Sequence, residues 1–164
     1  MTKFIISTDS CVDLFKGHLD KNGVHCITMK RVLKGEEISE HYDSVKEFDA
    51  FYDALKKGAL PTTVAINPAE MQQHFEEILA KEKEGDIIHI PLSSGLSVTC
   101  ESAIKAAEEI NKTLKGRQIY VVDSLGATLM MGMYVEELIK LRNEGVPTAR
   151  AIERIHELRD HTQA

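Results

Sequence analysis

Short apolar runs of strand length alternate with stretches of helical periodicity along almost the whole chain. Strands are predicted over residues 3–8, 24–33, 87–92 and 118–122. Helices are predicted over residues 13–21, 45–57, 68–84, 99–112, 128–143 and 148–159. This alternation is typical of an α/β fold, and we expect a Rossmann-like three-layer domain with a mostly parallel sheet and helices on both faces.

Two helices carry clear start signals. Ser44, with Glu47 three residues later, forms a predicted capping box. Asn67 is the predicted cap of the next helix, and Pro68 occupies its first position. These signals predict that the two helices begin at residues 45 and 68, each directly after a loop.

Composition and charge narrow the possible partners. The chain has 164 residues, of which 43% are hydrophobic, so one domain with a sizeable core is expected. Its formal net charge of −6 argues against nucleic acid or an anionic membrane as a general partner. No apolar run approaches the roughly 18 residues of a membrane span. The three cysteines, Cys11, Cys26 and Cys100, fit no disulfide framework or zinc pattern and indicate a reducing, cytoplasmic location.

A loop rich in serine follows the strand predicted over residues 87–92. The sequence Ser93-Ser94-Gly95-Leu96-Ser97 leads directly into a predicted helix, whose free N–H groups and dipole favour an anion. The loop contains no His, Lys, Asp or Glu, so binding is expected there rather than catalysis. It matches neither the Walker phosphate loop nor the nucleophile elbow of hydrolases.

Three further polar segments lie next to predicted elements. Thr8-Asp9-Ser10 and Asp123-Ser124 each follow a predicted strand, and Pro61-Thr62-Thr63 lies in the loop predicted before the helix capped by Asn67. Because the carboxyl ends of parallel strands meet at one edge of a sheet, we expect all four segments to line one crevice suited to a carboxylate or phosphate. The same residue types are ordinary helix caps, which is the alternative interpretation.

Other polar residues favour structural roles. His89 lies within an apolar strand and is interpreted as a core histidine. Asp9 and Asp13 are four residues apart and could contact a metal ion, but a capping role for Asp9 explains it better. No metal or cofactor is predicted.

In this order, the polar segments resemble the DegV family of bacterial fatty-acid-binding proteins. Residues 8–14, Thr-Asp-Ser-Cys-Val-Asp-Leu, resemble its opening signature, and residues 92–97, Leu-Ser-Ser-Gly-Leu-Ser, match its central motif. Pro61-Thr62-Thr63 is similar to the start of a further family segment, and Val121-Val122-Asp123-Ser124 to its last strand.

The resemblance implies a lipid carrier rather than an enzyme. Family members bind one long-chain fatty acid in a tunnel between two domains, and a partner kinase phosphorylates the bound carboxylate. The resemblance implies that Thr63 and Ser93 hold the head group, with Ser94 beside them and Thr62 nearby. The candidate ligand-binding residues are Thr62, Thr63, Ser93, Ser94, Gly95, Asp9, Ser10 and Ser124.

The resemblance also bears on domain organisation. Family members continue into a second domain, and residues 1–164 correspond to the first alone. We therefore expect a single N-terminal α/β domain that lacks half of the tunnel wall, binds fatty acid weakly or not at all, and exposes an apolar face.

Two departures from the family pattern keep other functions open. Val64-Ala65-Ile66 replaces a polar Ser-Gln-Pro, and Val98 stands where glycine is usual. A regulatory domain that has lost ligand binding is one alternative. The other is an enzyme acting on a small carboxylated or phosphorylated metabolite, with Asp9 or Asp123 as general base.

Overall fold

A four-stranded parallel sheet forms the centre of the molecule. The computed structural model describes residues 4–33, 35–39 and 45–162, without the side chains of Ser39, Glu47 and Phe48. The strand order is β2-β1-β6-β7, and every neighbouring pair is parallel. These strands are β1 (Ile5–Asp9), β2 (Val24–Ile27), β6 (Ile87–Ile90) and β7 (Ile119–Val121).

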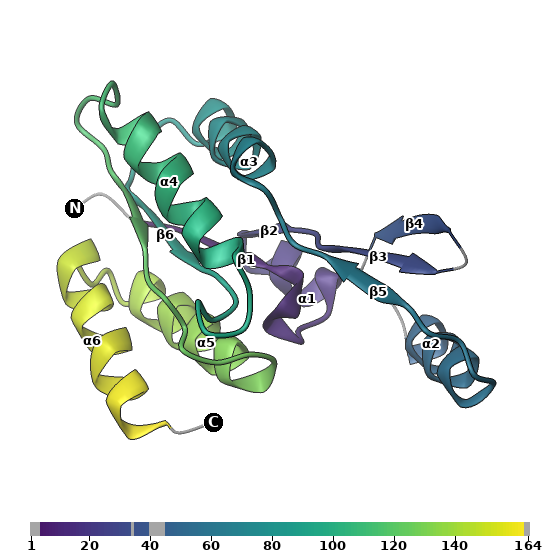
Figure 1. The fold of residues 1–164 in the computed structure, drawn as a ribbon. Helices are drawn as coiled ribbons and strands as arrows, with labels where there is room; N and C mark the ends of the chain where they lie inside the picture. The colour runs from purple at the N-terminus through teal and green to yellow at the C-terminus, as the bar shows by residue number, and fades with distance from the viewer. Residues whose placement is uncertain (1–3, 34, 40–44, 163–164) are drawn as a thin grey trace.

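Helices cover both faces of this sheet (Figure 1). One face packs against α3 (Pro68–Lys81) and α4 (Thr99–Asn111). The other face packs against α1 (Lys16–Lys21), α5 (Leu129–Asn143) and α6 (Thr148–His161). The predicted three-layer α/β fold is therefore confirmed.

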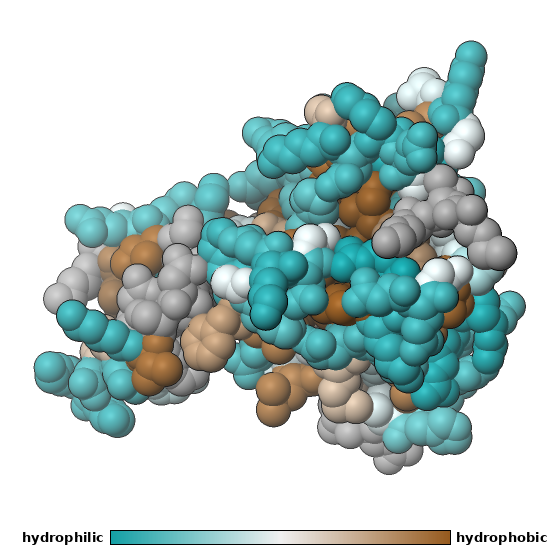
Figure 2. Space-filling view, turned by 180° about the vertical axis from the view of Figure 1, so that it is seen from behind, coloured by the Kyte–Doolittle hydropathy of each residue, from teal (hydrophilic) through white to brown (hydrophobic). Residues whose placement is uncertain are grey.

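The exterior is mostly hydrophilic on the face seen in Figure 2, with hydrophobic residues gathered in separate patches. Large exposed apolar side chains include Leu96, Leu125 and Leu129 in and beside the loops at the carboxyl ends of the strands. Among the residues described, no helix is long and apolar enough to cross a membrane.

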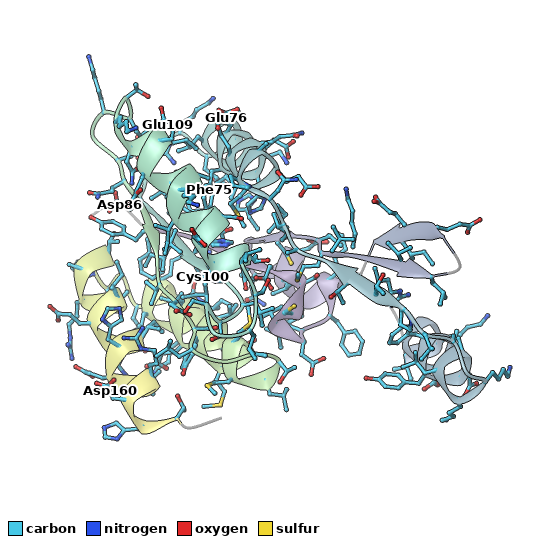
Figure 3. All side chains as sticks on the ribbon, in the orientation of Figure 1. Phe75, Glu76, Asp86, Cys100, Glu109 and Asp160 are labelled. Atoms are coloured by element: carbon cyan, nitrogen blue, oxygen red, sulfur yellow. The ribbon has the colours of Figure 1, made fainter. Side chains whose placement is uncertain are left out.

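Successive residues of the central strands contribute alternately to two hydrophobic cores, one on each face of the sheet. Ile5 of β1 contributes to the core beneath α3 and α4, whereas Phe4 and Ile6 contribute to the core beneath α5. Successive side chains of a strand point to opposite faces, which explains why these runs are apolar throughout. The α3 stripe predicted from its spacing is fully buried: Met71, Phe75 and Ile78. Figure 3 shows Phe75 directed inward from α3 and its neighbour Glu76 directed outward.

A second, antiparallel sheet was not predicted. Strands β3 (Lys30–Leu33), β4 (Glu36–Ser39) and β5 (Thr62–Val64) pair in the order β4-β3-β5. With α2 (Val45–Lys56) they form an arm that extends from the body (Figure 1). We refer to β3, β4, α2 and β5 together as the arm.

The prediction of one strand over residues 24–33 is wrong. Residues of β2 pair with β1 in the body, whereas β3 pairs with β4 and β5 of the arm. The chain leaves the central sheet between them, where the Met29 N–H donates to Ser10 Oγ at 2.9 Å. A continuous apolar run cannot reveal that its two halves have different partners.

The predicted helix start at Asp13 is also wrong. Residues Ser10–Val12 form a short 3₁₀ turn, and Asp13 ends it in the left-handed conformation at φ 55° and ψ 36°. That conformation interrupts a right-handed helix, so α1 starts only at Lys16. Ser44, the predicted cap of α2, lies outside the described residues.

The predicted cap of α3 is confirmed as a complete capping box. The Asn67 side chain accepts the Glu70 N–H at 3.0 Å, and the Glu70 carboxylate accepts the Asn67 N–H at 3.0 Å. Both hydrogen bonds of the box are exposed, so the box stabilises the start of α3 rather than the hydrophobic core.

Replacing Asn67 with alanine is expected to lower the free energy of unfolding by about 1 kcal/mol. Urea denaturation checks this, and a change indistinguishable from zero contradicts it.

Candidate functional site

Asp9 ties together two loops at the carboxyl edge of the central sheet. Its side chain is fully buried. One carboxylate oxygen accepts the Cys11 N–H at 2.9 Å and the other accepts the Leu92 N–H at 2.7 Å. The predicted cap role of Asp9 is confirmed, since it precedes the 3₁₀ turn and bonds to it. Its carboxylate oxygens bind loop backbone, which favours a structural role over that of a general base.

The N–H groups of the serine loop donate to acceptors in the loop itself and in the loop after β7. The N–H of Ser93 donates to Gly126 O, and those of Leu96 and Ser97 donate to Ser93 O. The Gly95 N–H donates to Ser93 Oγ at 3.1 Å. The N–H groups of residues 93–97 are therefore already bonded within the protein, and the expectation of an anion at the start of α4 stays a prediction. The buried Ser93 Oγ accepts the Gly95 N–H, which leaves its hydroxyl proton for donation to a ligand.

Asp123 and Ser124 order the neighbouring loop. The Asp123 carboxylate accepts the Ser94 N–H at 3.2 Å and the Leu125 N–H at 3.0 Å, and it also bonds to Ser94 Oγ. The buried Ser124 hydroxyl donates to Gly126 O at 2.9 Å. These contacts join the loop after β7 to the serine loop, so the two segments meet as predicted.

Thr62 and Thr63 lie in a different environment from the other candidates. Both are exposed on β5, where Thr63 pairs with Arg31 of β3. We predicted a loop here, and the segment is instead a strand of the arm. Three of the four polar segments are thus joined by direct hydrogen bonds, and the fourth belongs to the second sheet.

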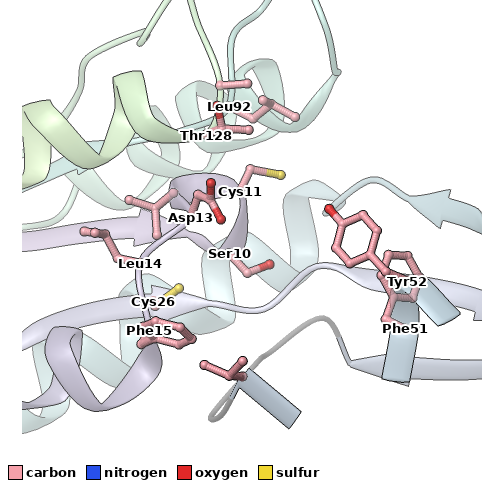
Figure 4. A pocket seen from close by; sticks show the side chains of 13 residues that line it. Ser10, Cys11, Asp13, Leu14, Phe15, Cys26, Phe51, Tyr52, Leu92 and Thr128 are labelled. Atoms are coloured by element: carbon pink, nitrogen blue, oxygen red, sulfur yellow. The ribbon is translucent and has the colours of Figure 1, made fainter. Parts of the chain in front are cut away.

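A cavity of about 440 Å³ lies between the body and α2 of the arm. Figure 4 shows Leu92 and Thr128 on one side, Phe15 and Cys26 on another, and Phe51 and Tyr52 on the side of the arm. Its size falls within the roughly 300–1,000 Å³ usual for small-molecule sites. Its lining is Ser10, Cys11, Val12, Asp13, Leu14, Phe15, Cys26, Val45, Phe51, Tyr52, Leu92, Ala127 and Thr128.

Only Ser10 of the eight candidate residues lines this cavity. Its hydroxyl accepts the Met29 N–H and thereby holds the start of the arm against the body. Sequence reasoning missed the aromatic wall made by Phe15, Phe51 and Tyr52. The only available signal was that Phe51 and Tyr52 lie in an amphipathic helix, which does not reveal what that helix faces.

Strained backbone gathers around the same cavity. Asp13 and Thr128, which both line it, have φ values of 55° and 54° although neither is glycine. Such conformations cost about 1–3 kcal/mol each and concentrate at functional sites. The 3₁₀ turn that precedes Asp13 lies close to α5, because a Cβ at Gly132 would be only 3.2 Å from Val12 O.

Two cysteines also form part of the cavity wall. Burial raises the pKa of the Cys26 thiol to about 12, and the nearby Asp9 carboxylate adds to this effect. Cys100 lies away from the cavity on α4, where burial raises its pKa to about 11. Both thiols therefore stay protonated near neutral pH. Their spacing in the sequence did not indicate that Cys11 and Cys26 face a cavity.

A buried polar network lies on the other side of the sheet. Ser7 Oγ is 2.9 Å from His74 Nε2 and 2.9 Å from His89 Nδ1. Burial lowers the pKa of His74 to about 4, with a further contribution from His25. Burial also holds the pKa of His89 well below its ordinary value. His89 is a buried core histidine, as interpreted, and it faces α3 rather than the cavity.

Comparison with protein families identifies one match over nearly the whole chain. A family model described as "Uncharacterised protein, DegV family" matches residues 3–164. A DegV domain-containing protein of Staphylococcus aureus (strain N315) is 30% identical over 162 residues, which cover 98% of this chain and 54% of that protein. A second relative, from Lactococcus lactis subsp. lactis (strain IL1403), is 32% identical over 151 residues, 92% of this chain and 51% of its own. The chain spans about half the length of the curated relatives it matches.

Solved structures of similar proteins share the fold. A DegV family protein from Thermus thermophilus, described as fatty acid binding, superimposes with a TM-score of 0.79 at 27% identity, covering 96% of this chain and 54% of that one. DegV from Bacillus subtilis, described as a fatty acid binding protein, gives a TM-score of 0.79 at 25% identity, with coverages of 98% and 55%.

Proposed function

Since the chain belongs to the DegV family, we propose that it binds a long-chain fatty acid and carries it, rather than transforming it. The observation that carries this proposal is the apolar cavity of about 440 Å³ between the body and the arm. Similar proteins from Thermus thermophilus and Bacillus subtilis are described as binding fatty acids. The cavity supports the same ligand class for this chain.

The acyl chain is the main source of affinity in this proposal. Burying each methylene group contributes roughly 0.8 kcal/mol. The side chains of Leu14, Phe15, Phe51 and Leu92 provide apolar surface for it. Asp13 also lines the cavity, and its negative charge disfavours a carboxylate nearby. The carboxylate is therefore expected to point away from Asp13, toward the hydroxyl groups at the edge of the sheet.

Hydroxyl groups hold the carboxylate in this proposal. Ser93, next in the chain to the cavity residue Leu92, has a hydroxyl proton to donate, and Thr63 presents an exposed hydroxyl on β5. Ser94 stands beside Ser93, with Ser10, Gly95, Ser124 and Asp9 as supporting residues. Thr62 is the chain neighbour of Thr63 and makes no contact with the carboxylate in this proposal. A buried carboxylate without such partners costs several kcal/mol.

Presentation of the carboxylate to a partner kinase is the finer part of the proposal. Ser94 and Thr63 are both exposed, so a head group bound at either side chain can be reached from outside. The Asp9 and Asp123 carboxylates both accept backbone N–H groups, and this engagement supports a carrier rather than an enzyme with either as general base. The remaining half of the relatives' length is proposed to supply the other wall of the tunnel.

A titration followed by amide NMR tests fatty-acid binding and tolerates weak affinity. Decanoate is added to the ¹⁵N-labelled chain, and decanol serves as a ligand with the same tail and no carboxylate. Both are expected to shift signals of the cavity lining, including Phe15, Tyr52 and Leu92. Only decanoate is expected to shift Thr63 and Ser93. If neither ligand moves any cavity signal, the proposed function is wrong.

Replacing Thr63 with alanine is expected to weaken decanoate binding by roughly 10-fold to 100-fold, because a hydrogen bond to a charged group contributes about 1.5–3 kcal/mol. Thr62 is the matched control, since neighbouring residues of a strand point to opposite faces. The Thr62→Ala variant should keep the parent affinity in the same titration. Equal losses in both variants would show that the Thr63 hydroxyl does not hold the carboxylate.

A further inference from the structure

The cavity wall contains thiol groups whose chemistry fatty-acid binding does not use. Cys11 follows β1 and Cys26 lies on β2, and both line the cavity. All three cysteines carry thiols rather than disulfides. Figure 4 shows the Cys11 sulfur directed from the 3₁₀ turn toward the side of the cavity formed by Tyr52. A ligand chain in this cavity therefore passes close to a soft nucleophile.

The two thiols of the wall differ in their surroundings. The Cys26 sulfur lies 3.8 Å from Ile27 O, and burial, with a further contribution from Asp9, raises its thiol pKa to about 12. Cys11 lies at the carboxyl edge of the sheet, where its sulfur is 3.1 Å from Met29 Sδ at the start of the arm. Since the thiolate is the reactive form, this raised pKa disfavours reaction at Cys26. The Cys11 sulfur is the one directed toward the Tyr52 side of the cavity (Figure 4).

We propose that Cys11 covalently captures electrophilic acyl chains that enter the cavity, namely long-chain α,β-unsaturated aldehydes and ketones. This inference rests on the proposed function, because the cavity that would hold a fatty acid delivers the electrophile. The Cys11 sulfur forms a bond to the β-carbon while the carbon–carbon π bond breaks. The thiol proton ends on the α-carbon, so the thiol and the unsaturated chain join with no other product.

Selectivity for long chains follows from the apolar wall. An electrophile held next to the thiol reacts as part of one complex, which raises its effective concentration. The side chains of Leu14, Phe15 and Leu92 favour a long alkyl tail and offer nothing to a short, water-soluble enal. The ratio of the two rates therefore measures capture by the cavity and not the general reactivity of a thiol.

Two enals with the same reactive group provide the test. The chain is incubated with hexadecenal or with crotonaldehyde, and adducts are located by peptide mass spectrometry in the unmodified sequence. We expect the Cys11 adduct to form at least about tenfold faster with hexadecenal. Cys11→Ser and Cys11→Ala should both remove it, whereas Cys26→Ser and Cys100→Ser should retain it. Equal rates for the two enals, or modification mainly at another residue, would overturn the proposal.

The decanoate titration separates this proposal from the fatty-acid proposal. If decanoate shifts the cavity signals and no Cys11 adduct forms, covalent capture alone is wrong. If decanoate has no effect but hexadecenal still labels Cys11 selectively, capture stands and carboxylate binding is wrong. Saturated decanoate should also slow labelling by hexadecenal and leave labelling by crotonaldehyde unchanged.

Discussion

Replacing Asp9 with alanine is expected to lower the free energy of unfolding by about 3 kcal/mol. The substitution leaves the N–H groups of Cys11 and Leu92 without their acceptor in a buried place. Each hydrogen bond to a charged group is worth about 1.5–3 kcal/mol, and an unpaired buried donor adds its own cost. Urea denaturation of the two proteins at neutral pH measures the difference.

The conservative variant and an exposed control make this prediction specific. Asp9→Asn keeps the size of the side chain but only one acceptor oxygen, so about half of the loss is expected. Asp160→Asn makes the same chemical change on the exposed side of α6 and should stay within about 0.5 kcal/mol of the parent. If Asp9→Ala is as stable as the parent, Asp9 does not hold the two loops together.

The buried histidines are expected to make the protein sensitive to mild acid. The folded-state pKa of His74 is about 4, below its ordinary value of 6.5. Between these pH values the unfolded chain binds a proton that the folded chain does not. Stability is therefore fully present above about pH 6.5 and is lost as pH falls toward 4. His89, whose pKa is lowered further by complete burial, shifts stability in the same direction.

When pH falls from 7 to 5, proton binding at position 74 of the unfolded chain is expected to lower the free energy of unfolding by about 2 kcal/mol. The groups that face it are His25 of β2, His89 of β6, and Glu77 and Lys81 of α3. Desolvation is the largest cause, so these neighbours do not reverse the sign.

A glutamine at position 74 isolates this contribution. Glutamine can still bond to Ser7 but does not titrate near these pH values. The loss of stability between pH 7 and pH 5, measured by urea denaturation, should be about 2 kcal/mol smaller in His74→Gln than in the parent. His156→Gln, on the exposed side of α6, should leave the difference at the parent value. Parallel curves for His74→Gln and the parent would contradict the prediction.

The family and the fold class were predictable because their signals are local. Strand runs such as residues 87–92 and the helical stripe of Met71, Phe75 and Ile78 reflect burial that repeats every two or every three to four residues. The Asn67 cap could likewise be recognised within four residues of sequence. These features depend on neighbours in the chain, so the order of the residues is enough to reveal them.

The contents of the candidate site could be predicted only in part. The polar segments ending in Asp9 and beginning at Ser93 were found, because small polar residues at strand ends stand out against apolar runs. Their hydrogen-bond partners could not be predicted, since the same Ser and Asp side chains can bind a ligand or form hydrogen bonds to loop backbone. In the structure Asp9 and Asp123 bond to neighbouring loops, and the N–H groups of residues 93–97 donate to protein acceptors.

By itself, the sequence determined the parallel central sheet, its covering helices and the DegV family of this protein. Only the tertiary structure decided that residues 30–39 pair with residues 62–64 instead of extending the strand before them. It alone placed Phe51 and Tyr52 opposite Cys11 across a cavity. The physical reason is that contacts with residues distant in the chain decide which strands pair and which surface a helix packs against. A local sequence pattern contains no information about those contacts.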